Sequence, residues 1–242
     1  MTKKIKKRIA VIAFLVVVAA AVAGCAAYLG DYYRADTEAV DALTPADIMI
    51  TRNAQDNSLV FMPHGNVDTA LIFYPGGKVE YDAYIPLMSA CAEKGIMCIL
   101  PEMPFNLAVF DADAAESLYN MYPEIAHWYI GGHSLGGSMA ASYAADNAED
   151  FEGVVLLASY STENIEDLNV LSVYGSEDKV LDIEKYEKYK ANLPENFTEY
   201  IIDGGCHAYF GTYGEQSGDG TPLITNEEQI RIAADEIGDF IK

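Results

Sequence analysis

The stretch from Trp128 to Gly137 constrains the fold more than any other part of the sequence. It begins with apolar residues typical of a buried strand, passes through a Gly-x-Ser-x-Gly motif centred on Ser134, and ends in small residues. Glycine two positions away on each side of a serine suits a sharp strand-to-helix bend, where flanking Cβ atoms would not fit. We therefore expect a strand, a tight turn that exposes the Ser134 hydroxyl, and a helix over residues 135–146.

The chain is strongly acidic, with 37 Asp and Glu against 15 Lys and Arg and a net charge of −22. Five of the basic residues precede residue 9 and no acidic residue precedes Asp31, so the rest carries 10 basic and 37 acidic residues, or −27. Such a body repels phosphate backbones, which argues against nucleic acid as a partner. The 242 residues suffice for one α/β domain with a substantial core.

The N-terminus predicts attachment to a membrane. A basic segment, residues 3–8 with five Lys and Arg, precedes residues 9–29, which are apolar and uncharged, and this order places the body on the non-cytoplasmic side. Val22-Ala23-Gly24-Cys25 resembles a lipoprotein signal, which would lead to lipidation at Cys25, whereas the uninterrupted apolar run favours an uncleaved anchor. We expect a signal-anchor or lipoprotein signal segment over residues 1–30, a connecting segment over residues 31–45, and one catalytic domain over residues 46–242.

Apolar runs and turn residues predict a mostly parallel α/β sheet with helices on both faces. The expected strands are 48–51, 59–62, 70–74, 96–100, one from Trp128, 153–158, 170–174 and 198–202, and the expected helices are 81–94, 113–122, 135–146, 183–191 and one from Thr225. The loop over residues 159–166 is too short for an inserted lid, so we expect an open site without a lid domain.

A glycine loop, Pro75-Gly76-Gly77-Lys78, follows the predicted strand 70–74. Backbone N–H groups in such a loop can stabilise a negative oxygen, and the N–H after a nucleophilic serine does the same. We therefore expect Leu135 and Gly77 to donate to an oxyanion. A turn that needs glycine only for its backbone angles is the alternative for this loop. After the next strand, Met103 and Phe105 could line an acyl or alcohol pocket, although core packing would explain each alone.

An acid and a histidine follow two later strands. Asp178 comes just after the predicted strand 170–174, and we choose it to orient a histidine, with Glu177 and Asp182 as weaker rivals. His207 follows the predicted strand 198–202 on a glycine loop. The other histidines lie in a turn, before the strand that carries Ser134, and directly before Ser134 itself; they are His64, His127 and His133. We therefore predict Ser134, Asp178 and His207 as the catalytic residues.

The cysteines and histidines indicate neither a disulfide scaffold nor a metal site. Cys91 and Cys98 could pair in an oxidising compartment, but unpaired small apolar residues are the favoured interpretation. Cys206 is next to His207, yet adjacent side chains on an extended loop point apart, so we do not expect it to be the nucleophile. The four histidines have no ligand spacing with acids or thiols, so we expect no metal and no other cofactor.

Taken together, residues 46–242 resemble the α/β-hydrolase superfamily, whose catalytic residues occur in the order serine, acid, histidine. Residues 72–78, 103–108, 132–137 and 205–211 are similar to a group of small, lidless bacterial members, often membrane-tethered and distantly similar to dienelactone hydrolases. Asparagine is commoner in that group where this chain has Cys206. The resemblance implies the α/β-hydrolase fold and cleavage of carboxylic esters through an acyl-enzyme, without naming a substrate.

Two other functions stay open at this point. An acyltransferase would use the same three residues with an alcohol or amine as the acceptor, and a tethered binding protein would keep the fold without the chemistry. The expected partners are a small acyl ester and, through the N-terminal segment, a membrane. Nothing in the sequence indicates an oligomeric state.

Overall fold

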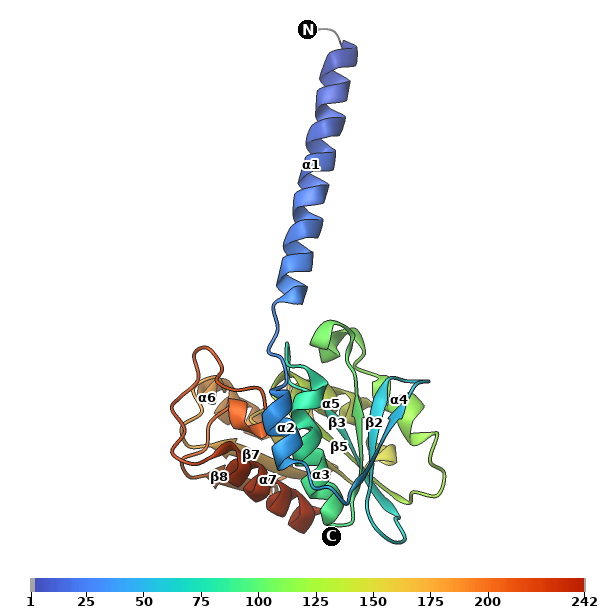
Figure 1. Cartoon of the computed structure of the whole chain (residues 1–242), viewed down its shortest axis with the longest axis vertical. Coiled ribbons are helices and arrows are strands. Elements are labelled where there is room, and N and C mark those ends of the chain that lie inside the picture. The colour runs from blue at the N-terminus through green and yellow to red at the C-terminus, as the bar shows by residue number, and fades with distance from the viewer. Residues whose placement is uncertain (1–2, 242) are drawn as a thin grey trace. The chain divides into compact units, whose positions relative to one another are not determined.

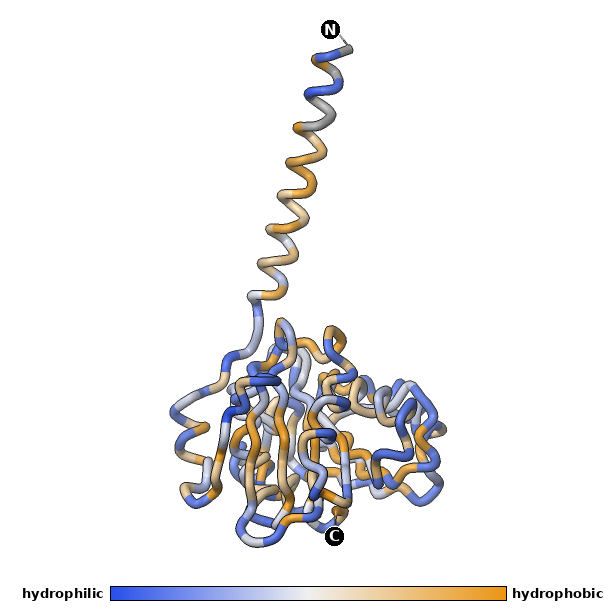
Figure 2. Tube along the Cα trace, turned by 90° about the vertical axis from the view of Figure 1, so that its right-hand side faces the viewer, coloured by the Kyte–Doolittle hydropathy of each residue, from blue (hydrophilic) through white to orange (hydrophobic). Residues whose placement is uncertain are grey.

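The computed structural model describes residues 3–241 and contains two compact units, one up to Tyr32 and one from Tyr33 onward (Figure 1). Residues 1, 2 and 242 lie outside the described residues. They are the first two residues of the predicted membrane segment and the last residue of the predicted catalytic domain. The first unit is helix α1 (Lys3–Gly30). Its span Ile12–Gly30 has a mean hydropathy of 2.5 with none of its residues buried, and Figure 2 shows it as a hydrophobic stretch. This length and composition suit a membrane anchor and equally a signal sequence.

The second unit is built on an eight-stranded sheet with the order β1-β2-β4-β3-β5-β6-β7-β8. The strands are β1 (Met49–Asn53), β2 (Ser58–Met62), β3 (Thr69–Tyr74), β4 (Met97–Pro101), β5 (His127–His133), β6 (Gly153–Leu157), β7 (Asn169–Gly175) and β8 (Thr198–Ile202). Strand β2 pairs antiparallel with β1 and β4, and the pairs from β4 to β8 are parallel. The expected mostly parallel sheet is confirmed, and the loops after β3, β5, β7 and β8 therefore meet at one edge.

Helices cover both faces of the sheet (Figure 1). They are α2 (Thr37–Leu43), α3 (Ile85–Glu93), α4 (Ala114–Tyr119), α5 (Leu135–Asp146), α6 (Ile183–Tyr189) and α7 (Asn226–Phe240). Apolar side chains of α3 and α7 form a core with one face, and those of α4 and α5 form a core with the other. Strand β3 contributes to both, with Leu71 and Phe73 in the first core and Ala70 and Ile72 in the second. Burial on both faces explains the continuous apolar run of this strand.

Several boundaries differ from those expected; the helix predicted over residues 113–122, for example, ends at Tyr119. The predicted helix 81–94 is a 3₁₀ turn (Tyr81–Tyr84) followed by α3, which begins at Ile85 with a proline in its first turn, where a missing N–H costs nothing. The compact unit also begins at Tyr33, within the expected connecting segment. The Tyr33 N–H donates to the Lys78 carbonyl at 2.7 Å, and the Glu80 N–H donates to the Tyr33 carbonyl at 2.9 Å. These long-range bonds attach the start of the body to the loop after β3.

Candidate active site

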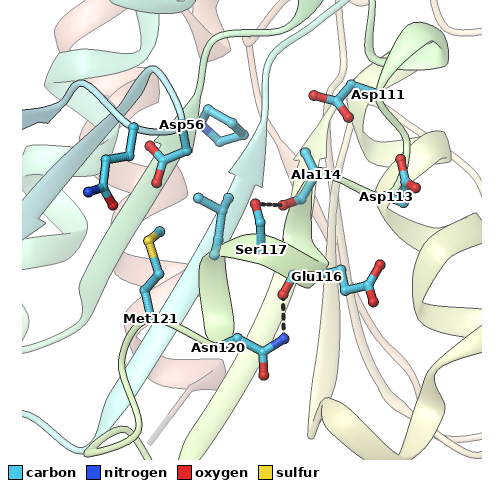
Figure 3. A pocket seen from close by; sticks show the side chains of 11 residues that line it. Asp56, Asp111, Asp113, Ala114, Glu116, Ser117, Asn120 and Met121 are labelled. Atoms are coloured by element: carbon cyan, nitrogen blue, oxygen red, sulfur yellow. Dashed lines mark hydrogen bonds between the residues drawn. The ribbon is translucent and has the colours of Figure 1, made fainter.

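A prominent cavity of the body does not contain the predicted site residues. It has a volume of about 690 Å³, lies beside α4 and β4, and has acidic walls from Asp56, Asp111, Asp113 and Glu116 (Figure 3). Burial, and after it the charge of Asp113, raise the pKa of Asp111. Within residues 3–241, no three His, Cys, Asp or Glu side chains are placed to hold a metal ion. The candidate catalytic residues are therefore sought on the loops at the carboxyl edge of the sheet.

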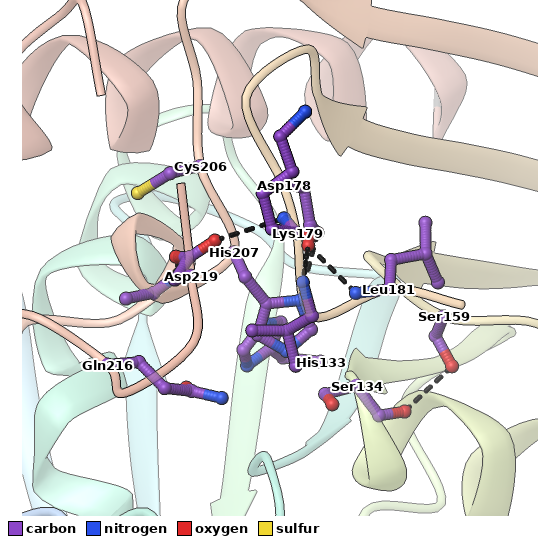
Figure 4. Close-up of polar contacts among 12 residues, drawn as sticks. His133, Ser134, Ser159, Asp178, Lys179, Leu181, Cys206, His207, Gln216 and Asp219 are labelled. Carbon is purple, nitrogen blue, oxygen red and sulfur yellow. Dashed lines mark hydrogen bonds and ion pairs between the residues drawn. The ribbon is translucent and has the colours of Figure 1, made fainter. Parts of the chain in front are cut away.

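Ser134 occupies a strained turn between β5 and α5. Its backbone has φ 51° and ψ −122°, a conformation that costs a non-glycine residue about 1–3 kcal/mol and persists only where the surroundings impose it. The surroundings do so from both sides: the Ser134 N–H donates to the Leu157 carbonyl at 2.9 Å, and the Ser159 hydroxyl donates to the Ser134 carbonyl at 2.7 Å (Figure 4). Ser134 as a residue is left partly exposed.

The two glycines of the motif are required by close packing against the end of β3. A Cβ atom on Gly136 would lie 2.2 Å from the Pro75 carbonyl oxygen, and one on Gly132 would lie 2.6 Å from the Tyr74 carbonyl oxygen. Real Cβ atoms do not approach so closely. The glycines thus allow the loop after β3 to lie beside Ser134.

Asp178 and His207 form a buried pair on the loops after β7 and β8 (Figure 4). Asp178 Oδ2 lies 2.8 Å from His207 Nδ1, and the two side chains are only 1% and 2% exposed. The other carboxylate oxygen, Oδ1, accepts hydrogen bonds of 2.8 Å from the N–H groups of Val180 and Leu181. The loop therefore fixes the carboxylate with one oxygen directed at the imidazole.

The rival acids have other partners. Glu177 accepts a hydrogen bond of 3.2 Å from the Ser176 hydroxyl. Asp182 caps α6 and accepts from the Lys185 N–H at 3.1 Å. The structure therefore pairs the predicted acid, and not its rivals, with His207.

Two of the other histidines are remote from this pair. His64 is exposed and lies 3.6 Å from Asp47, and His127 is exposed and paired with Glu152. Among the described histidines, His207 is the one with a buried carboxylate partner.

Two N–H groups beside Ser134 are available to a ligand. In the loop after β3, the Gly76 N–H donates to the Tyr84 hydroxyl at 3.0 Å and the Lys78 N–H donates to the Asn106 carbonyl at 2.7 Å. The N–H groups of Gly77 and Leu135 make no hydrogen bond within the part of the chain that the structure describes. A Cβ atom on Gly77 would lie 2.8 Å from Leu135 Cδ2, so these two predicted donors belong to segments in direct contact.

His133 is a buried residue packed on the candidate base. Its ring lies 4.5 Å from that of His207, centroid to centroid, and its Nδ1 lies 2.8 Å from the Tyr84 hydroxyl. Burial, and after it the neighbouring His207, hold the pKa of His133 well below its usual value, and burial raises the pKa of Tyr84. The Tyr84 hydroxyl oxygen accepts the Gly76 N–H, so the hydroxyl proton of Tyr84 can be donated to His133 Nδ1. The remaining proton of His133 is then on Nε2.

Two positioning side chains escaped the sequence analysis. The fully buried Gln229 on α7 accepts from the Cys206 N–H at 2.9 Å and donates to the Cys206 carbonyl at 2.7 Å. Asp219 accepts from the N–H groups of Ala208 at 2.9 Å and Lys179 at 3.3 Å, and so links the His207 loop to the Asp178 loop. Gln229 could have been found from the sequence, because it is a polar residue on the apolar face of the last helix. Asp219 could not, because it lies in a polar loop where an acidic residue is ordinary.

The cysteines are all unpaired, as the sequence analysis favoured. Cys91 and Cys98 are buried, and burial raises the pKa of Cys98 well above its usual value. Burial, and after it the charge of Asp219, raise the pKa of the Cys206 thiol to about 12. A buried, protonated thiol is a poor nucleophile.

Comparisons with known proteins agree with this architecture. A family model described as "Alpha/beta hydrolase family" matches residues 70–231, which include Ser134, Asp178 and His207. Among solved structures, the chain is similar to TT1662 from Thermus thermophilus, with a TM-score of 0.59 and 14% identity over 81% of this chain and 98% of that chain. At this identity the similarity concerns the fold alone. The search of curated proteins gave no match.

Proposed function

Because the chain belongs to the alpha/beta hydrolase family, we propose that it is a serine hydrolase that cleaves carboxylic esters through Ser134, His207 and Asp178. The observation that carries the proposal is the buried 2.8 Å pair of Asp178 and His207. It lies at the same edge of the sheet as a serine that the backbone holds in a strained, partly exposed turn.

The pair supports the acid–base steps. With its Nδ1–H donating to Asp178, His207 has Nε2 available to take the Ser134 proton as Oγ bonds to the ester carbonyl carbon. The same proton then passes to the departing alcohol as the ester C–O bond breaks, which leaves an acyl group on Ser134. Water attacks this acyl group, gives a proton to His207 and releases the acid, and the returning proton restores the Ser134 hydroxyl.

The negative charge on the carbonyl oxygen in each step needs fixed donors. The N–H of Leu135, at the start of α5, and the N–H of Gly77 have no other described partner and belong to contacting segments. Donors of this kind contribute on the order of 100-fold to 1000-fold each to turnover. We assign the oxyanion to these two groups.

The test compares wild type with Ser134→Ala on dissolved p-nitrophenyl acetate and butyrate. We expect hydrolysis by wild type and a loss of about 10⁵-fold or more in the variant. Equal rates for the two proteins would contradict the proposal. Product analysis with added alcohols or amines distinguishes an acyltransferase, because transfer would yield a new ester or amide in place of the free acid.

We also propose that α1 tethers the enzyme with its body on the extracytoplasmic side. The apolar span Ile12–Gly30 and the basic residues before it support this orientation. Protease added to intact spheroplasts of a bacterial host should degrade the body, and protection of the body would contradict the orientation. Intact-mass analysis distinguishes an uncleaved anchor from a chain shortened and lipidated at Cys25.

A further inference from the structure

An apolar rim lies on the loop between β4 and α4. It consists of Phe105, Val109 and Phe110, whose exposed fractions are 60%, 48% and 57%. The two phenylalanine rings contact each other edge to face at a centroid distance of 5.8 Å. Among the phenylalanines of residues 33–241, these two are the exposed ones. Clustered exposed apolar side chains of this kind mark binding surfaces.

The backbone of the rim is strained. Phe105 and Asn106 both have φ 56°, in the left-handed region that a bulky residue such as phenylalanine rarely adopts. The strain is retained because the Asn106 carbonyl accepts the Lys78 N–H at 2.7 Å. Core packing does not account for this conformation, since the Phe105 side chain is exposed. Strain of this kind concentrates at functional sites.

The rim begins next to the proposed oxyanion donors. The Leu107 side chain lies against Gly77, where a Cβ atom would be 3.6 Å from Leu107 Cδ2. Leu135 contacts the same glycine. An acyl chain that extends from a carbonyl bound at Gly77 and Leu135 would therefore meet Leu107 and then the apolar rim.

The chain also joins the proposed anchor directly to this edge of the body. Helix α1 ends at Gly30, and Tyr33 is already hydrogen-bonded to Lys78 and Glu80 in the loop after β3. Only residues 31 and 32 lie between, and they can span at most about 10 Å, whatever orientation the helix takes. In a protein anchored through α1, only two residues of chain therefore separate the anchor from Tyr33, which is hydrogen-bonded to the loop that carries Gly77.

From these observations we propose that the substrate is an ester resident in the lipid bilayer, and that its acyl chain lies on the apolar rim while Ser134 attacks its carbonyl. The proposal rests on the proposed function and names its substrate class. The contact is apolar rather than electrostatic, because acidic residues flank the rim, namely Glu102, Asp111 and Asp113, and the body is strongly acidic. Zwitterionic phosphatidylcholine vesicles are therefore the appropriate membrane.

The first test locates the rim without requiring activity. The only tryptophan of the chain, Trp128, is 8% exposed, so a tryptophan introduced in full-length protein reports on its own surroundings against a buried background. We expect brominated phosphatidylcholine to quench the emission of Phe105→Trp in reconstituted vesicles. The matched control is Met49→Trp, on β1 at the edge of the sheet, where Met49 is 65% exposed. Equal, weak quenching of both variants would overturn the proposal.

The second test measures kcat/KM of the reconstituted full-length protein on a diacylglycerol embedded in the vesicles and on dissolved p-nitrophenyl acetate. Phe105→Ala and Phe110→Ala should each lose about 10-fold on the embedded ester, the effect of losing most of one side chain's apolar burial, and less than 2-fold on acetate. Met49→Ala should change neither value.

Each other outcome of the second test has a definite meaning. Unchanged hydrolysis of the embedded ester by the rim variants overturns the inference and leaves the proposed function intact. Rim-dependent hydrolysis of dissolved octanoate esters without hydrolysis of the embedded ester overturns the bilayer as the source. No hydrolysis of acetate contradicts the proposed function, in which case quenching of Phe105→Trp still decides whether the rim contacts lipid.

Discussion

The candidate catalytic residues and the apolar rim lie on loops at the same edge of the sheet, yet they are held in opposite ways. Asp178 and His207 are buried, and both oxygens of the carboxylate have partners. Phe105 and Phe110 are exposed on an irregular loop, in which Phe105 has a left-handed backbone and the Asn106 carbonyl accepts from the Lys78 N–H. Proton transfer requires fixed distances between the reacting groups, whereas an apolar chain can bind to any exposed apolar surface. The fold therefore constrains the side chains of Asp178 and His207 far more than those of Phe105 and Phe110.

The comparison predicts that changes in the buried network lower kcat, whereas changes in the rim raise KM for long-chain esters. Asp178→Asn should give the largest effect among the positioning residues, a loss of about 10⁴-fold in kcat, because the amide favours the wrong imidazole tautomer. The matched control is Asp182→Asn, which weakens a helix cap and should leave kcat within about 2-fold. Steady-state kinetics on p-nitrophenyl acetate measures both. Similar losses in the two variants would contradict the choice of Asp178.

Gln229→Met should lower kcat by about 10-fold and reduce the free energy of unfolding by about 1–3 kcal/mol. The substitution keeps the volume but leaves the buried N–H and carbonyl of Cys206 unpaired, next to His207. Urea unfolding and steady-state kinetics measure the two effects, with the exposed Gln55→Met as the control. A variant with reduced stability and unchanged kcat would show that Gln229 supports the fold without positioning His207.

Tyr84→Phe tests the link between the loop after β3 and His133. Loss of the hydroxyl leaves the Gly76 N–H and His133 Nδ1 without their bonds, which should lower stability by about 1–3 kcal/mol and kcat by several-fold, with KM unchanged. Tyr81→Phe is the matched control, because the buried Tyr81 hydroxyl has no partner among the described residues. Its removal should not lower stability. Equal responses of the two variants would contradict a positioning role for Tyr84.

The low pKa of His133 predicts a dependence of stability on pH. The unfolded chain binds a proton at this residue below a pH of about 6.5, whereas the folded chain keeps it neutral. The free energy of unfolding should therefore fall as the pH is lowered from about 6.5 towards the folded pKa, by up to about 1.4 kcal/mol per pH unit from this group, and the group should have no effect above that range. Urea unfolding of wild type and His133→Asn measures it; identical slopes would contradict the assignment.

Cys206→Ala should have the smallest effect, a change of less than about 2-fold in kcat. The thiol is buried with a raised pKa, and Gln229 holds the backbone of this residue rather than its side chain. Resistance of wild-type activity to iodoacetamide provides an independent check. Loss of activity in Cys206→Ala, with normal folding, would require a catalytic role for the sulfur.

Local patterns in the sequence predicted the sheet, the turn at Ser134, and the strand-to-loop positions of Asp178 and His207. Each depends on periodicity or turn chemistry within a few residues, as in the continuous apolar run of β3. The long apolar N-terminal helix was recognisable for the same reason, since apolarity over one helix length is a local property.

Contacts between segments distant in the chain could not be predicted in this way. Tyr84 lies 49 positions from His133, and Gln229 lies 23 positions from Cys206. Their roles arise only when the sheet and helices are assembled. The attachment of Tyr33 to the loop after β3 is of the same kind, so the start of the compact body lay within a segment expected to be a connection.

The central claim is that Ser134 is the nucleophile activated by His207. Peptide mass spectrometry after incubation with a fluorophosphonate tests it most directly, because the reagent bonds covalently to an activated serine. We expect one adduct, on the peptide that contains Ser134, and its loss in Ser134→Ala and His207→Gln. An adduct on another residue, or equal labelling of wild type and Ser134→Ala, would contradict the claim.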